Sequence, residues 1–322
     1  MNETVEGSML LKKDPLIAVV GPTAVGKTEL SIRLAETLQG EIINADSMQV
    51  YQGMTIGTAK PTDAERARVP HHLIDMLHPT EPWTVSSFQD RALAAISNVK
   101  ARGKMPIMVG GTGLYVQAIT HHLSFSKAES DPAYRQELEM FAQKQGGSAL
   151  FQLLVEKDPK AAESIHPHNE RRVIRALEVL HTTGHRFSER EEEQSVPRFH
   201  SALIGLTMDR ELLYSRINQR VDRMMELGLV EEVEALYKAG IEGPAIQAIG
   251  YKELYAYFNR EQSLSQAIDQ IKTRSRQYAK RQLTWFKNKS EAEWFDVTSQ
   301  TIEEILPKVV DFSCRKFKNG LE

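Results

Sequence analysis

Residues 16–28 read Leu-Ile-Ala-Val-Val-Gly-Pro-Thr-Ala-Val-Gly-Lys-Thr, an apolar stretch that runs directly into a glycine-rich loop. The β-branched run predicts a buried strand, and the loop has the Gly-x4-Gly-Lys-Thr spacing of a phosphate-binding loop. Its glycines let backbone amides turn around an anion, Lys27 adds a positive charge, and the Thr28 hydroxyl can bind Mg2+. The residues expected to hold phosphates are Gly21, Pro22, Thr23, Ala24, Val25, Gly26, Lys27 and Thr28.

Strand and helix patterns alternate after this loop. Leu30, Leu34 and Leu38 recur every four residues and predict a helix that Gly40 ends. Further strand patterns lie at residues 41–45, 106–110 and 201–207. Such alternation is typical of a parallel sheet flanked by helices, so we predict an α/β fold of the P-loop NTPase type.

One segment departs from this alternation. From about residue 124 to 198 the strand patterns stop and helical patterns take over, separated by Pro and Gly pairs. The clearest helix begins near Asn169 and ends at Gly184. We therefore predict a P-loop α/β catalytic core formed by residues 1–123 and 199–322, with an all-helical domain inserted at 124–198.

The composition is that of an ordinary globular protein, with 322 residues, 41% of them hydrophobic and 26% charged. No apolar run approaches the roughly 20 residues that span a bilayer, and the polar N-terminus does not resemble a secretory signal. We expect a cytoplasmic protein that does not contact membranes, and nothing in the sequence requires more than a monomer. Only Cys314 is present, which excludes an intrachain disulfide and a multi-cysteine zinc site.

Carboxylates near the loop are candidates for catalysis. A P-loop kinase should hold Mg2+ with an acid at the end of an apolar strand, and the strand at 107–110 has none. Asp46 follows the strand at 41–45 and is preferred over Asp75. Among the cations, Arg220 is the candidate to complete a diphosphate site. A histidine beside apolar residues, like His71, is more often structural, and an arginine stripe like that of Arg216 is usually a solvated face; whether either contributes to the site stays open.

Basic residues cluster twice. Residues 270–290 hold seven Lys and Arg side chains and no Asp or Glu, although the net charge of the chain is −3. A second cluster, Arg171, Arg172 and Arg175, opens the helix that begins near Asn169. Two such clusters beside a phosphate loop indicate a polyanionic partner, which we expect to be structured RNA.

The chain resembles the bacterial tRNA dimethylallyltransferases, also called tRNA isopentenyltransferases. The segments that carry the resemblance are Gly21–Thr28, Asn44–Tyr51, Gly57–Pro61, Val109–Tyr115, Arg175–Val179, Ala248–Tyr251 and Ala279–Trp285. The resemblance implies transfer of a dimethylallyl group from dimethylallyl diphosphate to N6 of the adenosine 3′ of the anticodon, tRNA position 37, with release of pyrophosphate. It also implies that ATP is neither substrate nor cofactor.

The resemblance assigns roles to single residues. Asp46 is the general base, Thr28 binds Mg2+, and Arg220 assists the leaving diphosphate. The residues implied to contact the tRNA anticodon stem-loop are Asp46, Ser47, Met48, Gln49, Thr112, Arg135, Arg171, Arg172, Arg175, Gln247, Gly250, Tyr251, Lys252, Lys280, Arg281, Gln282, Trp285 and Lys287. Met48 departs from the family, because many relatives have arginine there, and the C-terminus lacks the zinc finger of eukaryotic relatives.

Two other enzyme classes stay open at this stage. An adenylate dimethylallyltransferase resembles this family but prenylates free AMP or ATP, and it would not need an RNA-binding insertion. A P-loop kinase of a small molecule would bind ATP and Mg2+. A non-enzymatic GTPase-like RNA-binding module is disfavoured, because the chain has no guanine-recognising Asn-Lys-x-Asp segment.

Overall fold

The computed structural model describes residues 13–123, 131–190 and 196–318. The chain divides into two compact units. The larger unit comprises Met1–Thr120 and Phe199–Glu322, and the helical unit comprises His121–Arg198.

The larger unit is built on a six-stranded sheet of order β3-β2-β4-β1-β5-β6 in which every neighbouring pair is parallel. The strands are β1 (Pro15–Val20), β2 (Gly40–Asn44), β3 (His71–His72), β4 (Met105–Gly110), β5 (His200–Thr207) and β6 (Glu293–Asp296). In the register, Ile17 of β1 lies opposite Ile107 of β4 on one side and Ala202 of β5 on the other. The predicted α/β fold with a parallel sheet is confirmed.

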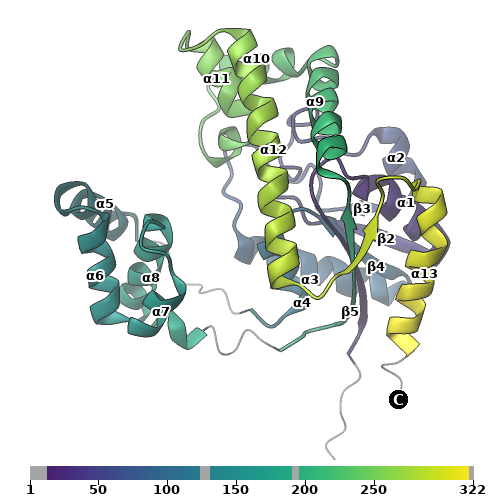
Figure 1. Cartoon of the computed structure of the whole chain (residues 1–322), viewed down its shortest axis with the longest axis horizontal. Coiled ribbons are helices and arrows are strands. Elements are labelled where there is room, and N and C mark those ends of the chain that lie inside the picture. Colours follow the sequence, from purple (N-terminus) through teal and green to yellow (C-terminus); the bar gives the residue numbers. More distant parts are fainter. Residues whose placement is uncertain (1–12, 124–130, 191–195, 319–322) are drawn as a thin grey trace, which may run out of the picture. The chain divides into compact units, whose positions relative to one another are not determined.

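Helices of the larger unit cover the sheet and extend beyond its carboxyl edge (Figure 1). They are α1 (Lys27–Leu38), α2 (Asp63–Arg68), α3 (Val85–Ala101), α4 (Gly113–Thr120), α9 (Arg210–Glu226), α10 (Leu229–Lys238), η3 (Pro244–Gln247), α11 (Tyr251–Phe258), α12 (Leu264–Lys289) and α13 (Ile302–Lys318).

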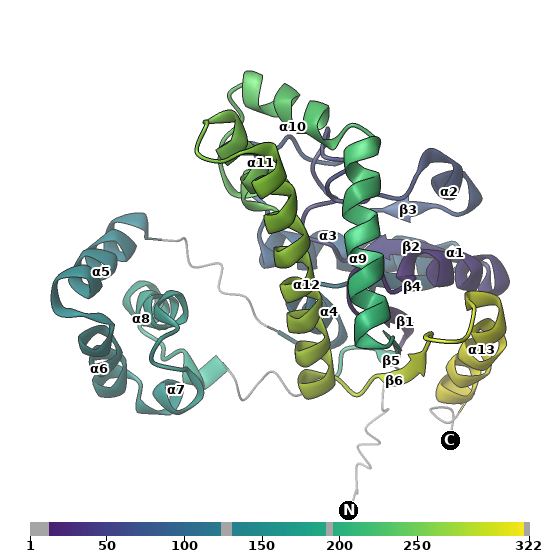
Figure 2. The same ribbon diagram turned by 45° about the horizontal axis from the view of Figure 1, so that its top comes forward.

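Alternate residues of β1 face the two layers of helices. Ile17 and Val19 are buried in the core that includes α1 and α13, whereas Ala18 and Val20 are buried in the core of α3 and α4. Figure 2 shows α1 and α13 side by side in the first layer. Because both faces are covered, β1 is apolar throughout, as expected for a central parallel strand.

A third apolar core lies beyond the carboxyl ends of the strands. There the segment from Val50 to Met54 shares a core with α9, α10, α11 and α12, which contribute Val221, Leu229, Tyr251 and Ile271 respectively. The long polar stretch after β2 is thus fixed by four helices. Open parallel sheets bind their ligands at this edge.

The helical unit has its own core, which contains Leu150, Leu154, Val173 and Leu177. Its helices are α5 (Pro132–Gln145), α6 (Gly147–Lys157), α7 (Pro159–Ser164), α8 (Glu170–Thr183) and η1 (Ser188–Arg190). No helix among the described residues is long and apolar enough to cross a membrane.

Candidate active site

The phosphate loop connects β1 to α1. Gly21 has φ 140°, and a Cβ atom there would lie 2.6 Å from the carbonyl oxygen of Leu206, so this position requires glycine. Gly26, with φ 105°, precedes the first residue of α1, and Ala24 also has a positive φ of 65°. The loop therefore presents the amino end of α1 to the carboxyl edge of the sheet, where an anion is stabilised.

Lys27 lies inside this loop. Its Nζ donates hydrogen bonds to the carbonyl oxygens of Gly21 (3.0 Å) and Pro22 (2.7 Å). Burial and the nearby charge of Arg220 lower the pKa of Lys27, Asp46 opposes them, and the net pKa is about 7. The lysine is thus partly neutral near pH 7, and an anionic ligand would favour its charged form.

Gln282 of α12 joins the phosphate loop to the turn after β4. Its Oε1 accepts a hydrogen bond from the backbone N–H of Thr23 (2.8 Å), and its Nε2 donates to the carbonyl oxygen of Gly111 (3.0 Å). Gln282 is only 5% exposed. Its side-chain amide therefore fixes the phosphate loop to the turn after β4.

Asp46 begins a tight turn immediately after β2. Its Oδ1 accepts hydrogen bonds from the N–H groups of Met48 (2.8 Å) and Gln49 (3.4 Å). Asn44 supports the turn, because its Oδ1 accepts from Asp46 N–H (3.2 Å) and its Nδ2 donates to Leu73 O (3.1 Å). No hydrogen bond from the described residues reaches Asp46 Oδ2, so this oxygen is left for a ligand.

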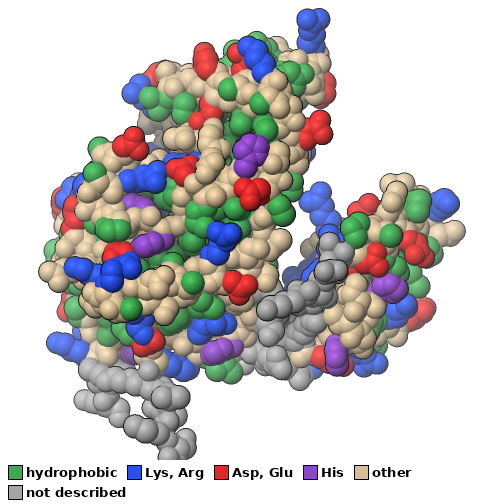
Figure 3. Space-filling view, turned by 180° about the vertical axis from the view of Figure 1, so that it is seen from behind, with side chains coloured by type: hydrophobic (Ala, Val, Ile, Leu, Met, Phe, Trp, Pro, Cys, Tyr) green, Lys and Arg blue, Asp and Glu red, His purple; other side chains and the backbone are tan. Residues whose placement is uncertain are grey.

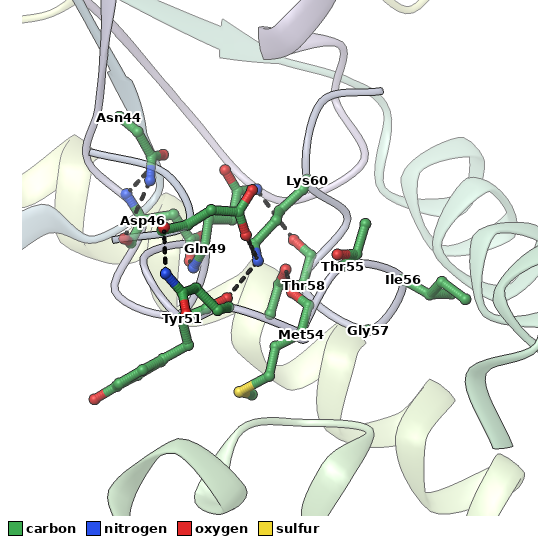
Figure 4. Close-up of polar contacts among 12 residues, drawn as sticks. Asn44, Asp46, Gln49, Tyr51, Met54, Thr55, Ile56, Gly57, Thr58 and Lys60 are labelled. Atoms are coloured by element: carbon green, nitrogen blue, oxygen red, sulfur yellow. Dashed lines mark hydrogen bonds and ion pairs between the residues drawn. The ribbon is translucent and has the colours of Figure 1, made fainter. Parts of the chain in front are cut away.

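The segment that follows Asp46 is held by buried polar contacts (Figure 4). Gln49 Nε2 donates to the carbonyl oxygens of Thr58 (3.1 Å) and Ala59 (3.2 Å). Lys60, only 7% exposed, donates to Tyr51 O and pairs with Asp75. The alternative acid considered from the sequence, Asp75, is therefore neutralised by Lys60 and by Arg66 (2.9 Å).

Two cavities meet beside Asp46. The phosphate-loop cavity, of about 420 Å³, is lined by Lys27 and Thr28. The adjacent cavity, of about 330 Å³, is lined by apolar side chains of α9 and α12 and by Gln247 and Gly250. The residues that line both, which we call the junction, are Thr23, Asp46, Thr58, Ala59, Arg220 and Tyr278. A reaction between two substrates would occur at the junction.

The structure brings the three predicted catalytic residues to one edge of the sheet. Arg220 Nη1 lies 3.4 Å from Thr23 Oγ1 as a hydrogen-bond donor, and Thr28 lines the phosphate-loop cavity. His71 and Arg216 also line that cavity. The sequence did not single out Tyr278, whose pKa burial raises to about 12 with help from the charge of Asp46.

Some predicted tRNA contacts line the adjacent cavity or lie close to it. Ser47, Met48, Gln247, Gly250 and Arg281 line it. Others have inward-facing side chains. Tyr251 is fully buried, and Thr112 Oγ1 is buried as well. Lys252, by contrast, is exposed at the first turn of α11.

The basic residues of α12 divide between two faces. Lys272 pairs with Asp222, and Arg274 pairs with the buried carboxylate of Glu253. An outward groove is lined instead by Gln277, Lys280, Arg281, Thr284, Trp285, Asn288 and Lys289. Seen from behind the view of Figure 1, acidic and basic side chains are intermixed on the larger unit (Figure 3). The α12 groove is thus a cationic surface with an aromatic side chain. Lys287 lies outside the groove and packs over the ring of Trp294 (5.7 Å).

In the helical unit, two predicted contacts share one buried acid. Arg135 and Arg175 both pair with Glu178 of α8, at 2.7 and 2.6 Å. Burial alone would raise the pKa of Glu178, but these hydrogen bonds outweigh it and lower the pKa. Arg171 and Arg172 are exposed at the start of α8. The two paired arginines remain partly exposed and keep N–H groups for a ligand.

The fold and site define a P-loop α/β protein in which a carboxylate and an arginine lie beside a cavity suited to a phosphorylated ligand. Comparison with known proteins defines it further, because residues 49–289 match the family model described as IPP transferase. The chain therefore belongs to the IPP transferase family. It is 58% identical over 302 residues to a tRNA dimethylallyltransferase of Shouchella clausii, with 94% of this chain and 96% of that protein covered. Identity to the enzyme of the same name from Bacillus subtilis is 51% over 300 residues, covering 92% and 96%.

Solved structures agree. A tRNA isopentenylpyrophosphate transferase from Bacillus halodurans superposes with a TM-score of 0.74 at 48% identity, covering 96% of this chain and 98% of that one. A eukaryotic dimethylallyltransferase acting on tRNA superposes with a TM-score of 0.82 at 32% identity, covering 95% and 80%. The family resemblance noted from the sequence motifs is confirmed.

Proposed function

We propose that this protein transfers a dimethylallyl group from dimethylallyl diphosphate to N6 of adenosine 37 of tRNA. The observation that carries the proposal is the junction, where a cavity suited to a diphosphate meets a second cavity beside Asp46. Two relatives that are tRNA dimethylallyltransferases are 58% and 51% identical to this chain, which supports the same reaction class and the same two substrates.

The donor diphosphate would occupy the phosphate-loop cavity. Lys27 and the backbone amides at the start of α1 would neutralise its charge, and Thr28 would help to hold Mg2+. The described residues contain no cluster of three or more His, Cys, Asp or Glu that could hold a metal ion. A hydroxyl oxygen together with diphosphate oxygens and water suits Mg2+, which often binds with few protein ligands. When bound, the ion supplies charge neutralisation to the diphosphate.

At the junction, the adenine amine would attack C1 of the dimethylallyl group. The N6–C1 bond forms as the C1–O bond breaks, and the electron pair of that bond leaves with pyrophosphate. The N6 proton passes to Asp46 Oδ2, the oxygen that the turn leaves free. The guanidinium of Arg220, beside Thr23, would stabilise the charge that develops on the departing diphosphate.

The acceptor would bind through its phosphates. We propose that the α12 groove and the arginines at the start of α8 contact the anticodon stem-loop, and that the target adenine is flipped into the adjacent cavity. A tRNA substrate places the reaction in the cytoplasm. We expect one chain to be sufficient for the reaction.

The test is transfer of label from dimethylallyl diphosphate, with Mg2+, to unmodified tRNA or to AMP. Label on the adenosine next to the anticodon supports the proposal. Label on AMP alone would assign the chain to the adenylate dimethylallyltransferases, and ATP consumption without label transfer would assign it to the kinases.

Asp46→Asn tests the role of the base within the same assay. Asparagine keeps an Oδ1 acceptor for the turn but cannot take the proton, so we expect turnover to fall by about 10²- to 10⁴-fold with tRNA binding retained. Asp90→Asn, an exposed acid on α3, is the matched control and should retain full turnover. Equal turnover in Asp46→Asn and wild type would remove Asp46 from the base role.

A further inference from the structure

One carboxylate outside the predicted site connects two walls of the adjacent cavity. Glu232 of α10 accepts four hydrogen bonds. Its Oε2 accepts from the backbone N–H groups of Thr55 (2.8 Å) and Ile56 (2.7 Å). Its Oε1 accepts from Gly57 N–H (3.1 Å) and from the hydroxyl of Tyr251 (2.6 Å).

The first wall is the turn that Glu232 binds through backbone amides. Figure 4 shows Thr55, Ile56 and Gly57 at this turn, which leads into Thr58. Gly57, Thr58 and Ala59 line the adjacent cavity, and the last two belong to the junction. Ala59 has a positive φ of 50°, a conformation that a residue with a Cβ adopts only where surrounding contacts hold it.

The second wall leads into Tyr251. This residue follows Gln247 and Gly250, which also line the cavity. Its ring lies against the turn so closely that a Cβ atom on Gly57 would be 2.5 Å from it. The Tyr251 hydroxyl donates to the same carboxylate that holds the turn, so Glu232 joins both walls at one point.

Hydrogen bonds of Gln49 connect this turn to Asp46. Gln49 Nε2 donates to the carbonyl oxygens of Thr58 and Ala59, and Gln49 N–H donates to Asp46 Oδ1. A displacement of the turn would therefore reach the carboxylate proposed as the base. Gln49 is the only side chain between the turn and Asp46 in this chain of hydrogen bonds.

We propose that Glu232 is a positioning residue that sets the distance between these walls and thereby places Thr58, Ala59 and Asp46 for the acceptor adenine. This inference rests on the function proposed above. The hydrogen bonds of Glu232 reach no residue of the phosphate loop, so we expect its loss to slow the reaction with the acceptor more than it weakens donor binding.

The perturbation that tests the proposal is Glu232→Gln. Glutamine replaces one acceptor oxygen by an NH2 group, which would face either two backbone N–H donors or Gly57 N–H and the Tyr251 hydroxyl. The matched control is Glu231→Gln, the same chemical change on the preceding, exposed residue of α10. Tyr251→Phe is a milder variant that removes one of the four hydrogen bonds.

Three quantities are measured for each variant at a temperature well below its Tm: the single-turnover rate of label transfer to saturating tRNA, the Kd for dimethylallyl diphosphate, and the Tm itself. We expect Glu232→Gln to lower the single-turnover rate by about 10- to 100-fold, the effect of misplacing a reacting group by up to about 1 Å. We expect its donor Kd to stay within about twofold. Tyr251→Phe should lower the same rate by about fivefold, consistent with one lost hydrogen bond.

The outcomes separate this inference from the proposed function. Wild type and Glu231→Gln that both fail to label tRNA would refute the function. If both label tRNA, an unchanged rate in Glu232→Gln overturns the inference, as does a rate that falls only in parallel with donor affinity. If Glu232→Gln does not fold, Tyr251→Phe decides: a slower rate with unchanged donor Kd supports the inference, and an unchanged rate overturns it.

Discussion

Replacement of Gln282 by leucine would test whether α12 supports the phosphate loop. Leucine has a similar volume but cannot bond the backbone N–H of Thr23 or the carbonyl oxygen of Gly111. Both groups would lose a partner at a site where the glutamine side chain is only 5% exposed. We expect the free energy of unfolding to fall and Thr23 to be held less firmly in the donor site.

The magnitude follows from the two hydrogen bonds. Each contributes a net of about 1 kcal/mol, and a buried group left unpaired costs about 1–3 kcal/mol. Water entering from the phosphate-loop cavity can satisfy Thr23 N–H, so only the net contribution of that hydrogen bond, about 1 kcal/mol, is lost there. The carbonyl oxygen of Gly111 stays unpaired, which costs about 1–3 kcal/mol. We therefore expect the free energy of unfolding to fall by about 2–4 kcal/mol. At about 2–4 °C per kcal/mol, the Tm should fall by at least about 4 °C.

The assay combines thermal unfolding with titration of dimethylallyl diphosphate. We expect the donor Kd of Gln282→Leu to rise about tenfold, because Thr23 is no longer fixed in the loop. Gln277→Leu, an exposed position on the same helix, controls for the change in helix composition and should alter neither quantity. A Tm within about 1 °C of wild type and a donor Kd within twofold would refute the argument that Gln282 supports the loop.

Two further predictions follow from the same region. Because Lys27 has a pKa of about 7 in the folded protein, donor binding above pH 7 must recruit a proton. The donor affinity of wild type should therefore fall by up to about tenfold per pH unit between pH 7 and 9. Lys27→Arg stays charged over this range and is the reference. A ratio of the two donor affinities that is constant with pH would contradict the prediction. Gly113→Ala would place a Cβ atom 2.2 Å from the ring of Trp285 and should lower the unfolding free energy by about 1–3 kcal/mol in chemical denaturation, whereas exposed Leu114→Ala should change it little.

Periodicity and glycine positions were sufficient to predict the central sheet. β1, β4 and the middle residues of β2 and β5 are apolar and are followed by turn residues, so the pattern indicates their burial. β3 and β6 were missed for a physical reason. β3 has two residues and β6 has four, two of which are acidic and largely exposed at the sheet edge. Such short edge strands are stabilised by neighbours, and their own composition carries little signal.

The candidate site was predictable only where local sequence determines geometry. The phosphate loop is local, since its conformation depends on Gly21 and Gly26. Gln282 and Glu232 act through hydrogen bonds to residues 259 and 175–177 positions away, and no sequence pattern indicates such pairs. Similarly, the acid-free stretch of α12 showed its charge but not that Arg274 faces Glu253.

The arrangement of α12 gives a physical reason why tRNA, and not a free nucleotide, would be the acceptor. On one face Gln282 binds Thr23 of the phosphate loop, and on another Lys280 and Trp285 line the outward groove. A continuous 26-residue helix carries both, so binding energy gained at the groove can be used to hold the loop and the junction in the reactive arrangement. AMP has no further nucleotides that could reach the groove. It would therefore lose the contribution of that remote contact to the chemical step as well as to binding.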